Sequence, residues 1–266
     1  MKARRERFVL KSQREIDLMR VAASTVSEVL DELVGMVAPG VTTWDLDAAA
    51  ESACRVRGVT PAFKGLYGFP ACLCVAVNEE VVHGIPSKKK VLREGDIIGL
   101  DFGVVYKGWY GDHARTVHVG VVSPAAARLV RVARESLEAA AAACVPGARL
   151  CEIGRIVEGH CTSHDYTVVR DFVGHGIGRK LHEDPQVPNY YDPNDRQMLK
   201  AGMVICIEPM VNAGSPDVRM LADDWTAVTA DGALSAHFEH TIAVTEGGPV
   251  VLSQSGWGAK PGAALA

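Results

Sequence analysis

The apolar positions near the start of the chain recur at helical spacing. Between residues 16 and 34 they lie three or four apart, which predicts an amphipathic helix. Ser12 and Glu15 have the spacing of a capping box, and Pro39 with Gly40 stops the helix. A threonine at 42 or 43 can cap a second helix, which reaches Gly58. The chain therefore opens with a predicted helix pair.

The pattern then changes to strands, and afterwards the order of elements repeats. Strands are predicted for ACLCVAVN (71–78), DIIGLDFGVVY (96–106) and, after a turn at Lys107 and Gly108, residues 109–122. Further elements follow in the same order as in the first half of the chain, and we expect helices at 124–144 and 150–164 and a strand-rich block at 167–252.

A shift of 107 positions relates the two halves. It carries Pro39 to Pro146, and it carries EGDIIGLD (94–101) onto AGMVICIE (201–208), so that Asp101 coincides with Glu208. The shift is not uniform, because HGI recurs with a different offset. We infer two related halves that face each other across a pseudo-twofold axis. A site between them would receive a carboxylate from an equivalent strand of each half.

Composition narrows the class of protein. The 266 residues are 48% hydrophobic and 23% charged, as in ordinary globular proteins, and the net charge of −4 gives no case for a nucleic-acid partner. No apolar run approaches the roughly 20 residues of a membrane span. Seven cysteines, an odd number in apolar or helical runs, favour core thiols in the reducing cytoplasm. We expect a single catalytic domain over residues 1–266, with flexible tails at about 1–11 and 254–266.

Four acids and one histidine stand in strand-like or glycine-rich contexts. They are Asp101, Asp112, His175, Glu208 and Glu239. A mostly oxygen donor set with one imidazole suits Mn, Fe(II), Co or Zn better than Ca, and five donors suit two ions. Each residue alone has an ordinary structural alternative, such as a turn acid or a core histidine. From the residues alone, a two-metal hydrolase and these structural roles both stay open.

The order of these five residues resembles the metal set of methionine aminopeptidases, in particular the bacterial type I family. The supporting stretches are NEEVVHGIP (78–86), LDFGVVYKGWYGD (100–112), GHGIGRKLHEDP (174–185), AGMVICIEPM (201–210) and LSAHFEHT (234–241). The resemblance implies an α+β pita-bread fold with two sheet-and-helix halves around a dinuclear site, which agrees with the repeat. It implies removal of the N-terminal methionine from nascent polypeptides or peptides with a small second residue.

The resemblance also implies a role for each ligand. Asp112 and Glu239 would bridge two divalent ions, Asp101 would hold one ion, and His175 with Glu208 would hold the other. A hydroxide that bridges the ions would attack the first peptide carbonyl. A monovalent cation is implied near Asn78, Glu80 and Ser235.

Three residues would act on the substrate by the same resemblance. Glu208 would carry a proton from the attacking water to the leaving amine. His83 would contact the scissile amide nitrogen, and His182 would contact the carbonyl oxygen. The free amine of the substrate would lie near Asp101.

A methionine side chain needs a narrow apolar pocket. Here the chain departs from the family pattern: Leu66 and Phe69 stand where tyrosines are common, Leu181 where Phe is common, and His237 where Gln is usual. We expect these changes to affect the shape of the pocket and the pH profile while leaving the metals in place. The matching pocket positions are Leu66, Phe69, Cys74, Leu181 and Trp225.

Other members of the fold are the alternatives. Prolidase and aminopeptidase P carry a large N-terminal domain, whereas only 100 residues precede Asp101 here. The short interval between Glu208 and Glu239 has no room for the helical insertion of the type II family. Non-catalytic relatives that bind peptides, histones or ribosomes lose metal ligands, and all five are present here. The resemblance further implies a monomer with a transient ribosome contact.

Overall fold

Both predicted helix pairs form, in a computed structural model that describes residues 8–254. The first pair consists of α1 (Gln13–Met36) and α2 (Thr43–Arg57). The carboxylate of Glu15 accepts hydrogen bonds from the backbone N–H and the hydroxyl of Ser12, both at 2.8 Å, so the capping box is confirmed. Thr42 caps α2 by accepting from the N–H of Asp45, and Gly58 ends it with φ of 66°.

The second helix pair lies where the repeat placed it. α3 (Pro124–Ala142) is capped by Ser123, whose hydroxyl accepts from the N–H of Ala126, and α4 (Cys151–Thr162) follows. Both helices end within two residues of the predicted ends. The predicted tails fall in part on residues 1–7 and 255–266, which lie outside the described residues.

Fifteen short strands and one 3-10 turn, η1 (Leu66–Gly68), complete the described part of the chain. The strands of the first half are β1 (Thr60–Pro61), β2 (Leu73–Val77), β3 (Glu80–Val82), β4 (Ile97–Tyr106) and β5 (Trp109–His118). Those of the second half are β6 (Thr167–Val168), β7 (Gly174–Gly176), β8 (Glu183–Val187), β9 (Val204–Ile207), β10 (Met210–Asn212), β11 (Val218–Met220), β12 (Ala227–Thr229), β13 (Ser235–His237), β14 (Glu239–Thr245) and β15 (Gly248–Val251).

The main sheet has nine strands among the described residues and joins the two halves. Its order is β1-β4-β5-β14-β9-β7-β8, with β2 added to β4 and β15 added to β14. The halves meet where β5 pairs with β14, and Glu239 lies opposite Ala114 there. Two smaller sheets have the orders β13-β10-β6 and β11-β12-β3. The strand order on either side of the β5–β14 seam agrees with the predicted pseudo-twofold relation.

A tight hairpin joins β4 to β5. Lys107 and Gly108 have φ of 49° and 76°, as a two-residue turn of type I′ requires, and the register pairs Tyr106 with Trp109. The predicted strand over 109–122 is too long, because β5 ends at His118 and the chain turns toward α3. The hairpin places Asp101 and Asp112 on neighbouring strands.

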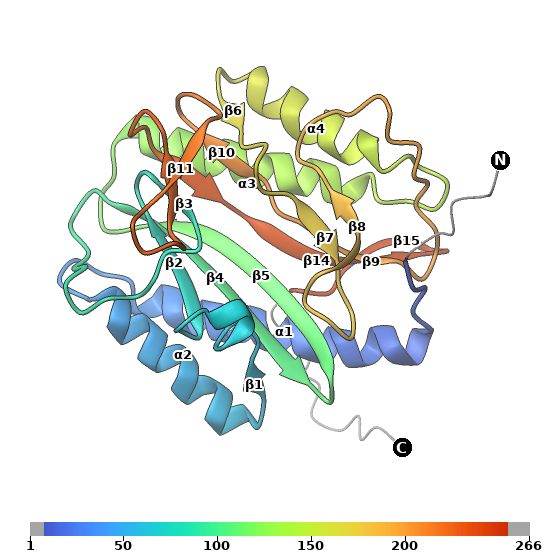
Figure 1. Ribbon diagram of the computed structural model, residues 1–266, viewed down its shortest axis with the longest axis horizontal. Helices are drawn as coiled ribbons and strands as arrows, with labels where there is room; N and C mark the ends of the chain where they lie inside the picture. The colour runs from blue at the N-terminus through green and yellow to red at the C-terminus, as the bar shows by residue number, and fades with distance from the viewer. Residues whose placement is uncertain (1–7, 255–266) are drawn as a thin grey trace.

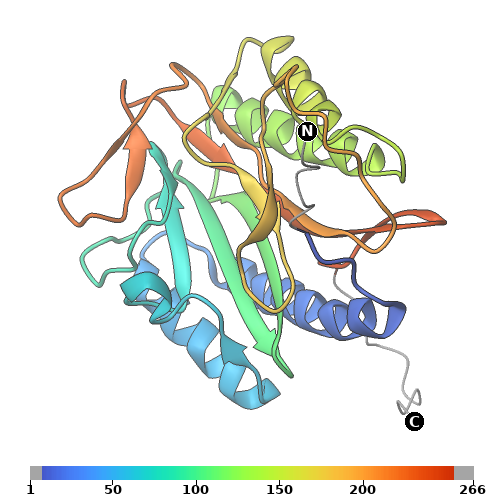
Figure 2. The ribbon, with the colours of Figure 1, turned by 45° about the vertical axis from the view of Figure 1, so that its right-hand side comes forward.

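The helices cover one side of the main sheet. Figures 1 and 2 show α1 and α2 at one end and α3 and α4 at the other, with the strands of both halves between them. Ala22, Val26 and Leu30 of α1 pack in one core cluster with Phe102, and Leu129 and Val132 of α3 pack in another. In the part of the chain that is described, no helix is long and apolar enough to cross a membrane. The opposite side of the sheet is left for a cleft.

Candidate metal centre

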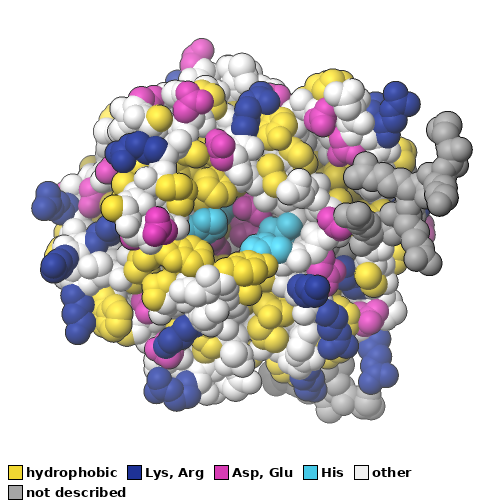
Figure 3. Space-filling model, in the orientation of Figure 1, with side chains coloured by type: hydrophobic (Ala, Val, Ile, Leu, Met, Phe, Trp, Pro, Cys, Tyr) yellow, Lys and Arg dark blue, Asp and Glu magenta, His cyan; other side chains and the backbone are white. Residues whose placement is uncertain are grey.

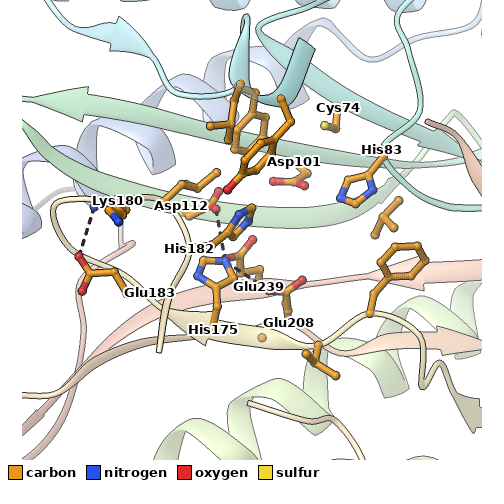
Figure 4. A pocket seen from close by; sticks show the side chains of 18 of the residues that line it. Cys74, His83, Asp101, Asp112, His175, Lys180, His182, Glu183, Glu208 and Glu239 are labelled. Carbon is orange, nitrogen blue, oxygen red and sulfur yellow. Dashed lines mark hydrogen bonds and ion pairs between the residues drawn. The ribbon is translucent and has the colours of Figure 1, made fainter. Parts of the chain in front are cut away.

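The first half of the chain supplies two acids to this cleft. Asp101 lies opposite Ala114 in the β4–β5 register, and Asp112 lies opposite Gly103. Because alternate residues of a strand point to opposite faces, these positions direct both carboxylates to the same face of the sheet. Asp112 is buried and Asp101 is partly buried, and both line the cleft in Figure 4.

The second half supplies His175, Glu208 and Glu239. His175 is the middle residue of β7, which is wedged between β8 and β9. A Cβ atom on Gly174 or Gly176 would approach a backbone oxygen of a neighbouring strand to 2.3 Å, so only glycine fits on either side of His175. Nε2 of His175 lies 3.5 Å from Oε1 of Glu208 and 4.0 Å from Oδ2 of Asp112. The structure thus brings all five predicted ligands into one cleft.

Hydrogen bonding leaves these side chains free to coordinate. Nδ1 of His175 donates to the carbonyl oxygen of Gly176 at 2.9 Å, which leaves the Nε2 lone pair directed at the acids. Oδ1 of Asp101 and Oε1 of Glu239 are buried and have no hydrogen-bond partner within the described structure. Buried acceptors without donors are costly unless a cation binds them. The donor set therefore fits divalent metal ions.

The electrostatics of the cleft support the same conclusion. Burial raises the pKa of Asp101 to about 7. Burial, followed by the neighbouring acids, raises the pKa of Asp112, Glu208 and Glu239 well above the usual range. Desolvation and like charge both disfavour the ionised carboxyl, and a bound divalent cation would reverse both effects.

These shifts predict how the metal-free protein responds to pH. Between about pH 4, where carboxyls of the unfolded chain lose their protons, and the folded pKa of about 7 for Asp101, the folded state holds more protons. The free energy of unfolding contributed by this group therefore falls as the pH rises through that interval. Thermal melts of chelator-treated protein should show a shallower fall in the Asp101→Asn variant than in the wild type. Equal pH slopes in the two proteins would contradict the assignment.

Two histidines predicted to act on the substrate also line this cleft. His83 has φ of 60°, and its ring meets Phe172 edge-on at 5.3 Å. The ring of His182 lies 4.5 Å from that of His175 and stacks on Tyr67 at 6.1 Å. Burial, with a smaller effect of His182, lowers the pKa of His83 to about 4, and burial lowers the pKa of His182. Both imidazoles are therefore neutral near pH 7 and can donate one hydrogen bond each.

The side chains proposed for the methionine pocket gather beside the acids. Phe69 meets Trp225 edge-on, with ring centroids 5.1 Å apart. All five predicted pocket residues, Leu66, Phe69, Cys74, Leu181 and Trp225, line a cleft of about 790 Å³ together with the five candidate ligands. Figure 3 shows a hollow in which histidines flank acidic side chains and hydrophobic side chains surround the opening.

Comparison with known proteins decides the family. The sequence matches metallopeptidase family M24 over residues 17–246. The chain belongs to metallopeptidase family M24. An M24 relative from Clostridium perfringens, named methionine aminopeptidase, is 48% identical over 246 residues, which cover 92% of this chain and 98% of the relative.

Solved structures agree with this assignment. The M24 chain superposes on a methionine aminopeptidase crystal structure from Thermotoga maritima with a TM-score of 0.91 and 45% identity, covering 93% of this chain and 99% of the other. A prolidase from Pyrococcus horikoshii shares the fold alone, with a TM-score of 0.76 and 23% identity, and this chain covers 64% of its length. The predicted pita-bread fold is confirmed, and the M24 chain carries a cluster of potential metal ligands.

The sequence does not single out Cys206, which lies beside the candidate ligands of this M24 chain. The cysteine pattern predicts a core thiol there, yet its sulfur lies within 4.8 Å of ligand atoms of Asp112, His175 and Glu239. The signal was its position two residues before Glu208, near the end of β9. His237, which departs from the family pattern, lines the cleft, and its buried Nε2 has no hydrogen-bond partner among the described residues.

A buried ion pair holds the loop that carries His182. Lys11 falls within the predicted N-terminal tail, but its side chain is only 3% exposed, and Nζ lies 2.7 Å from Oε2 of Glu183. Oε1 of Glu183 accepts hydrogen bonds from the backbone N–H groups of Arg179, at 2.7 Å, and Lys180, at 3.2 Å. Figure 4 shows Glu183 and Lys180 next to His182 at the cleft. A basic residue near the start of a chain is usually solvated, so this ion pair is not predictable from the sequence.

Lys11→Met should therefore destabilise the protein. Breaking a buried pair leaves the charge of Glu183 without its partner, and we expect a loss of roughly 3 kcal/mol in the free energy of unfolding. Urea denaturation would measure it. Lys64→Met is the matched control, because Lys64 pairs with Glu51 at the surface and its loss should cost less than about 1 kcal/mol. Equal losses of unfolding free energy in the two variants would contradict a stabilising role for the Lys11–Glu183 ion pair.

Proposed function

We propose that this protein removes the N-terminal methionine from peptides and nascent polypeptides whose second residue is small. One observation carries the proposal: five metal-type ligands from both halves meet beside an apolar pocket in a single cleft. The high identity to relatives named methionine aminopeptidase over nearly their whole length supports it.

We propose two divalent ions per chain, held by Asp101, Asp112, His175, Glu208 and Glu239. Mn, Fe(II), Co and Zn all suit this donor set. When bound, such ions supply a Lewis acid and a water acidic enough to act as a nucleophile near neutral pH.

The residues of the chain would then orient the substrate and move a proton. Glu208, with its raised pKa, is suited to take a proton from the attacking water and give it to the leaving amine. The backbone carbonyl of Glu208 accepts a hydrogen bond from Nδ2 of Asn189 at 3.0 Å, which fixes the chain at this residue. His83 would contact the scissile amide nitrogen, and His182 would donate to the carbonyl oxygen.

The pocket would select the first residue of the substrate. A thioether side chain is unbranched and polarisable, and it packs well against aromatic rings such as those of Phe69 and Trp225. The free amine would lie near Asp101, so the cleft would accept only the chain terminus. We also propose a cytoplasmic location, because all seven cysteines are unpaired thiols in the described structure.

A metal-exchange assay tests the function. The protein is stripped with a chelator, refilled with Mn, Fe(II) or Co, and given the peptide Met-Ala-Ser. We expect release of methionine only after refilling. A refilled protein that leaves the peptide intact would overturn the proposal.

The role of His83 predicts a specific split between turnover and metal binding. His83→Ala should lower kcat by roughly 10²-fold, the loss typical of one positioned hydrogen-bonding group in the transition state. Calorimetric titration should show the metals still bound, because His83 contacts the substrate and not the ions. His164→Ala, at a half-buried position outside the cleft, is the control and should keep full turnover. Loss of metal in His83→Ala would refute the assignment.

A further inference from the structure

A second group of polar side chains lies on the opposite face of the β5–β14 seam. Successive residues of a strand point to opposite faces, so Asp112 and Glu239 face the metal cleft while His113 and His240 face the other side. His113 and His240 are directly paired across the seam, and their rings stack at 4.7 Å with an angle of 9° between planes. The seam between the halves therefore carries ionisable side chains on both faces, with carboxyl groups toward the metal cleft and imidazoles on the other side.

These histidines form part of the floor of a separate cleft of about 790 Å³. Ser27 of α1 lies on one side, and residues of α3, including Arg131 and Arg134, lie on the other. Val130, Leu137 and Phe238 give the cleft an apolar part. It is thus a groove between the first helix of each half, which we call the rear groove.

Hydrogen bonds at the floor of the rear groove bear on the tautomers of His113 and His240. Nδ1 of His113 donates to the carbonyl oxygen of Glu239, so its Nε2 can accept from Nη2 of Arg115 at 3.1 Å. The hydroxyl of Ser253 accepts the N–H of Thr241 at 3.1 Å and lies 2.8 Å from Nδ1 of His240. When the hydroxyl of Ser253 donates its hydrogen to Nδ1 of His240, the ring hydrogen of His240 is on Nε2. Together with the guanidinium groups of Arg131 and Arg134, this N–H can donate to an anion.

The charges of the rear groove also favour an anionic ligand. Three guanidinium groups and one carboxylate, that of Glu138, line it. Arg134 and Glu138 form an exposed pair one helical turn apart, at 3.4 Å. Arg131 pairs in the same way with Glu135, which does not line the groove. Such pairs contribute only about 0.3–0.5 kcal/mol, so an anion can recruit the guanidinium groups at little cost.

Arg115 has a different role. Its Nη1 lies 2.5 Å from Oδ1 of Asp31, and its Nη2 also donates to Ser27. The guanidinium is held in place at the floor and keeps its positive charge, which disfavours a metal cation between His113 and His240. The rear groove is therefore suited to a negative ligand and not to a second metal.

We propose that the rear groove binds a small molecule that combines an anionic group, a phosphate or a carboxylate, with an apolar or aromatic portion. The anionic group would contact Arg131, Arg134 and Nε2 of His240. The apolar portion would pack against Val130 and Phe238. This site is separate from the metal cleft and does not depend on the peptidase activity.

Calorimetric titration of the metal-loaded, full-length protein with phenyl phosphate and with benzoate tests the proposal. Anions can also bind at the metals, so two variants are used to identify the binding of the probe in the rear groove. Arg131→Met with Arg134→Met should weaken it roughly tenfold or more, the effect of losing charge-assisted hydrogen bonds. Ala127→Trp should block it by filling the groove without a change of charge.

Matched controls and a direct location complete the test. Arg155→Met with Arg170→Met removes the same charge from exposed positions outside the groove and should leave binding unchanged. Binding in the rear groove should persist in chelator-treated protein, and anomalous scattering from tungstate-soaked crystals should place the anion beside Arg134. Equal weakening in both double variants, or tungstate found only at the metal cleft, would overturn the proposal.

Discussion

Asp112→Asn should make the metal-free protein more stable and the metal-loaded protein less stable. Without metal, the change removes one of several buried carboxyls that repel each other, and Tm should rise by roughly 2–4 °C for each kcal/mol recovered. With metal, the wild type gains about 2.7 kcal/mol at a metal concentration 100 times Kd, and the variant loses most of that gain. Peptidase activity should fall by about 10³-fold or more.

Scanning calorimetry of both proteins, with and without Mn, measures these opposite changes in Tm. Asp17→Asn is the control, because Asp17 is exposed on α1 and accepts a hydrogen bond from Gln13. Both of its Tm values should stay near those of the wild type. An Asp112→Asn variant with lower Tm under both conditions would mean that Asp112 supports the fold instead of a metal.

Glu208→Gln should lower kcat by about 10²–10⁴-fold, the contribution of a positioned general base and acid. The amide keeps the shape and one oxygen donor of the side chain but cannot carry a proton. Because Glu208 is also a proposed ligand, kcat is to be measured at saturating metal, where reduced affinity no longer limits the rate. The limb of the pH–rate profile that reports the Glu208 carboxyl should disappear.

A matched substitution separates this effect from a general loss of charge. Glu152→Gln on α4 removes the same charge from a surface pair with Arg155 and should leave kcat unchanged. A Glu208→Gln enzyme with kcat within threefold of the wild type at saturating metal would exclude Glu208 as the proton carrier.

Much of the fold was predictable because local signals agreed with the tertiary structure. The capping box at Ser12 and Glu15 and the Lys107-Gly108 turn each fix an element boundary through local chemistry. The strand-rich block of the second half was harder to divide into individual strands. Its strands are as short as two residues, as in β6, and so short a segment has no measurable periodicity. β6 is defined by its pairing with β10, which lies far along the chain.

The candidate site was predictable to the extent that its residues carry a pattern. The repeat placed Asp101 and Glu208 in equivalent strands, and the family resemblance supplied His83 and His182. The proximity of Cys206 to the ligands depends on the β7–β9 and β9–β14 registers, which one sequence does not reveal. The same holds for Lys11, whose partner Glu183 lies 172 residues away.

The division of the ligands between the halves has a consequence for biosynthesis. Asp101 and Asp112 belong to the β4–β5 hairpin, whereas the other three proposed ligands lie in the second half of the chain, with Glu239 as the final one. A growing chain can fold its first helix pair and hairpin long before Glu239 leaves the ribosome, but it then holds only two of the five proposed ligands. Complete metal capture by this proposed set would therefore be a late event in maturation, and bound ions would report that the two halves have docked.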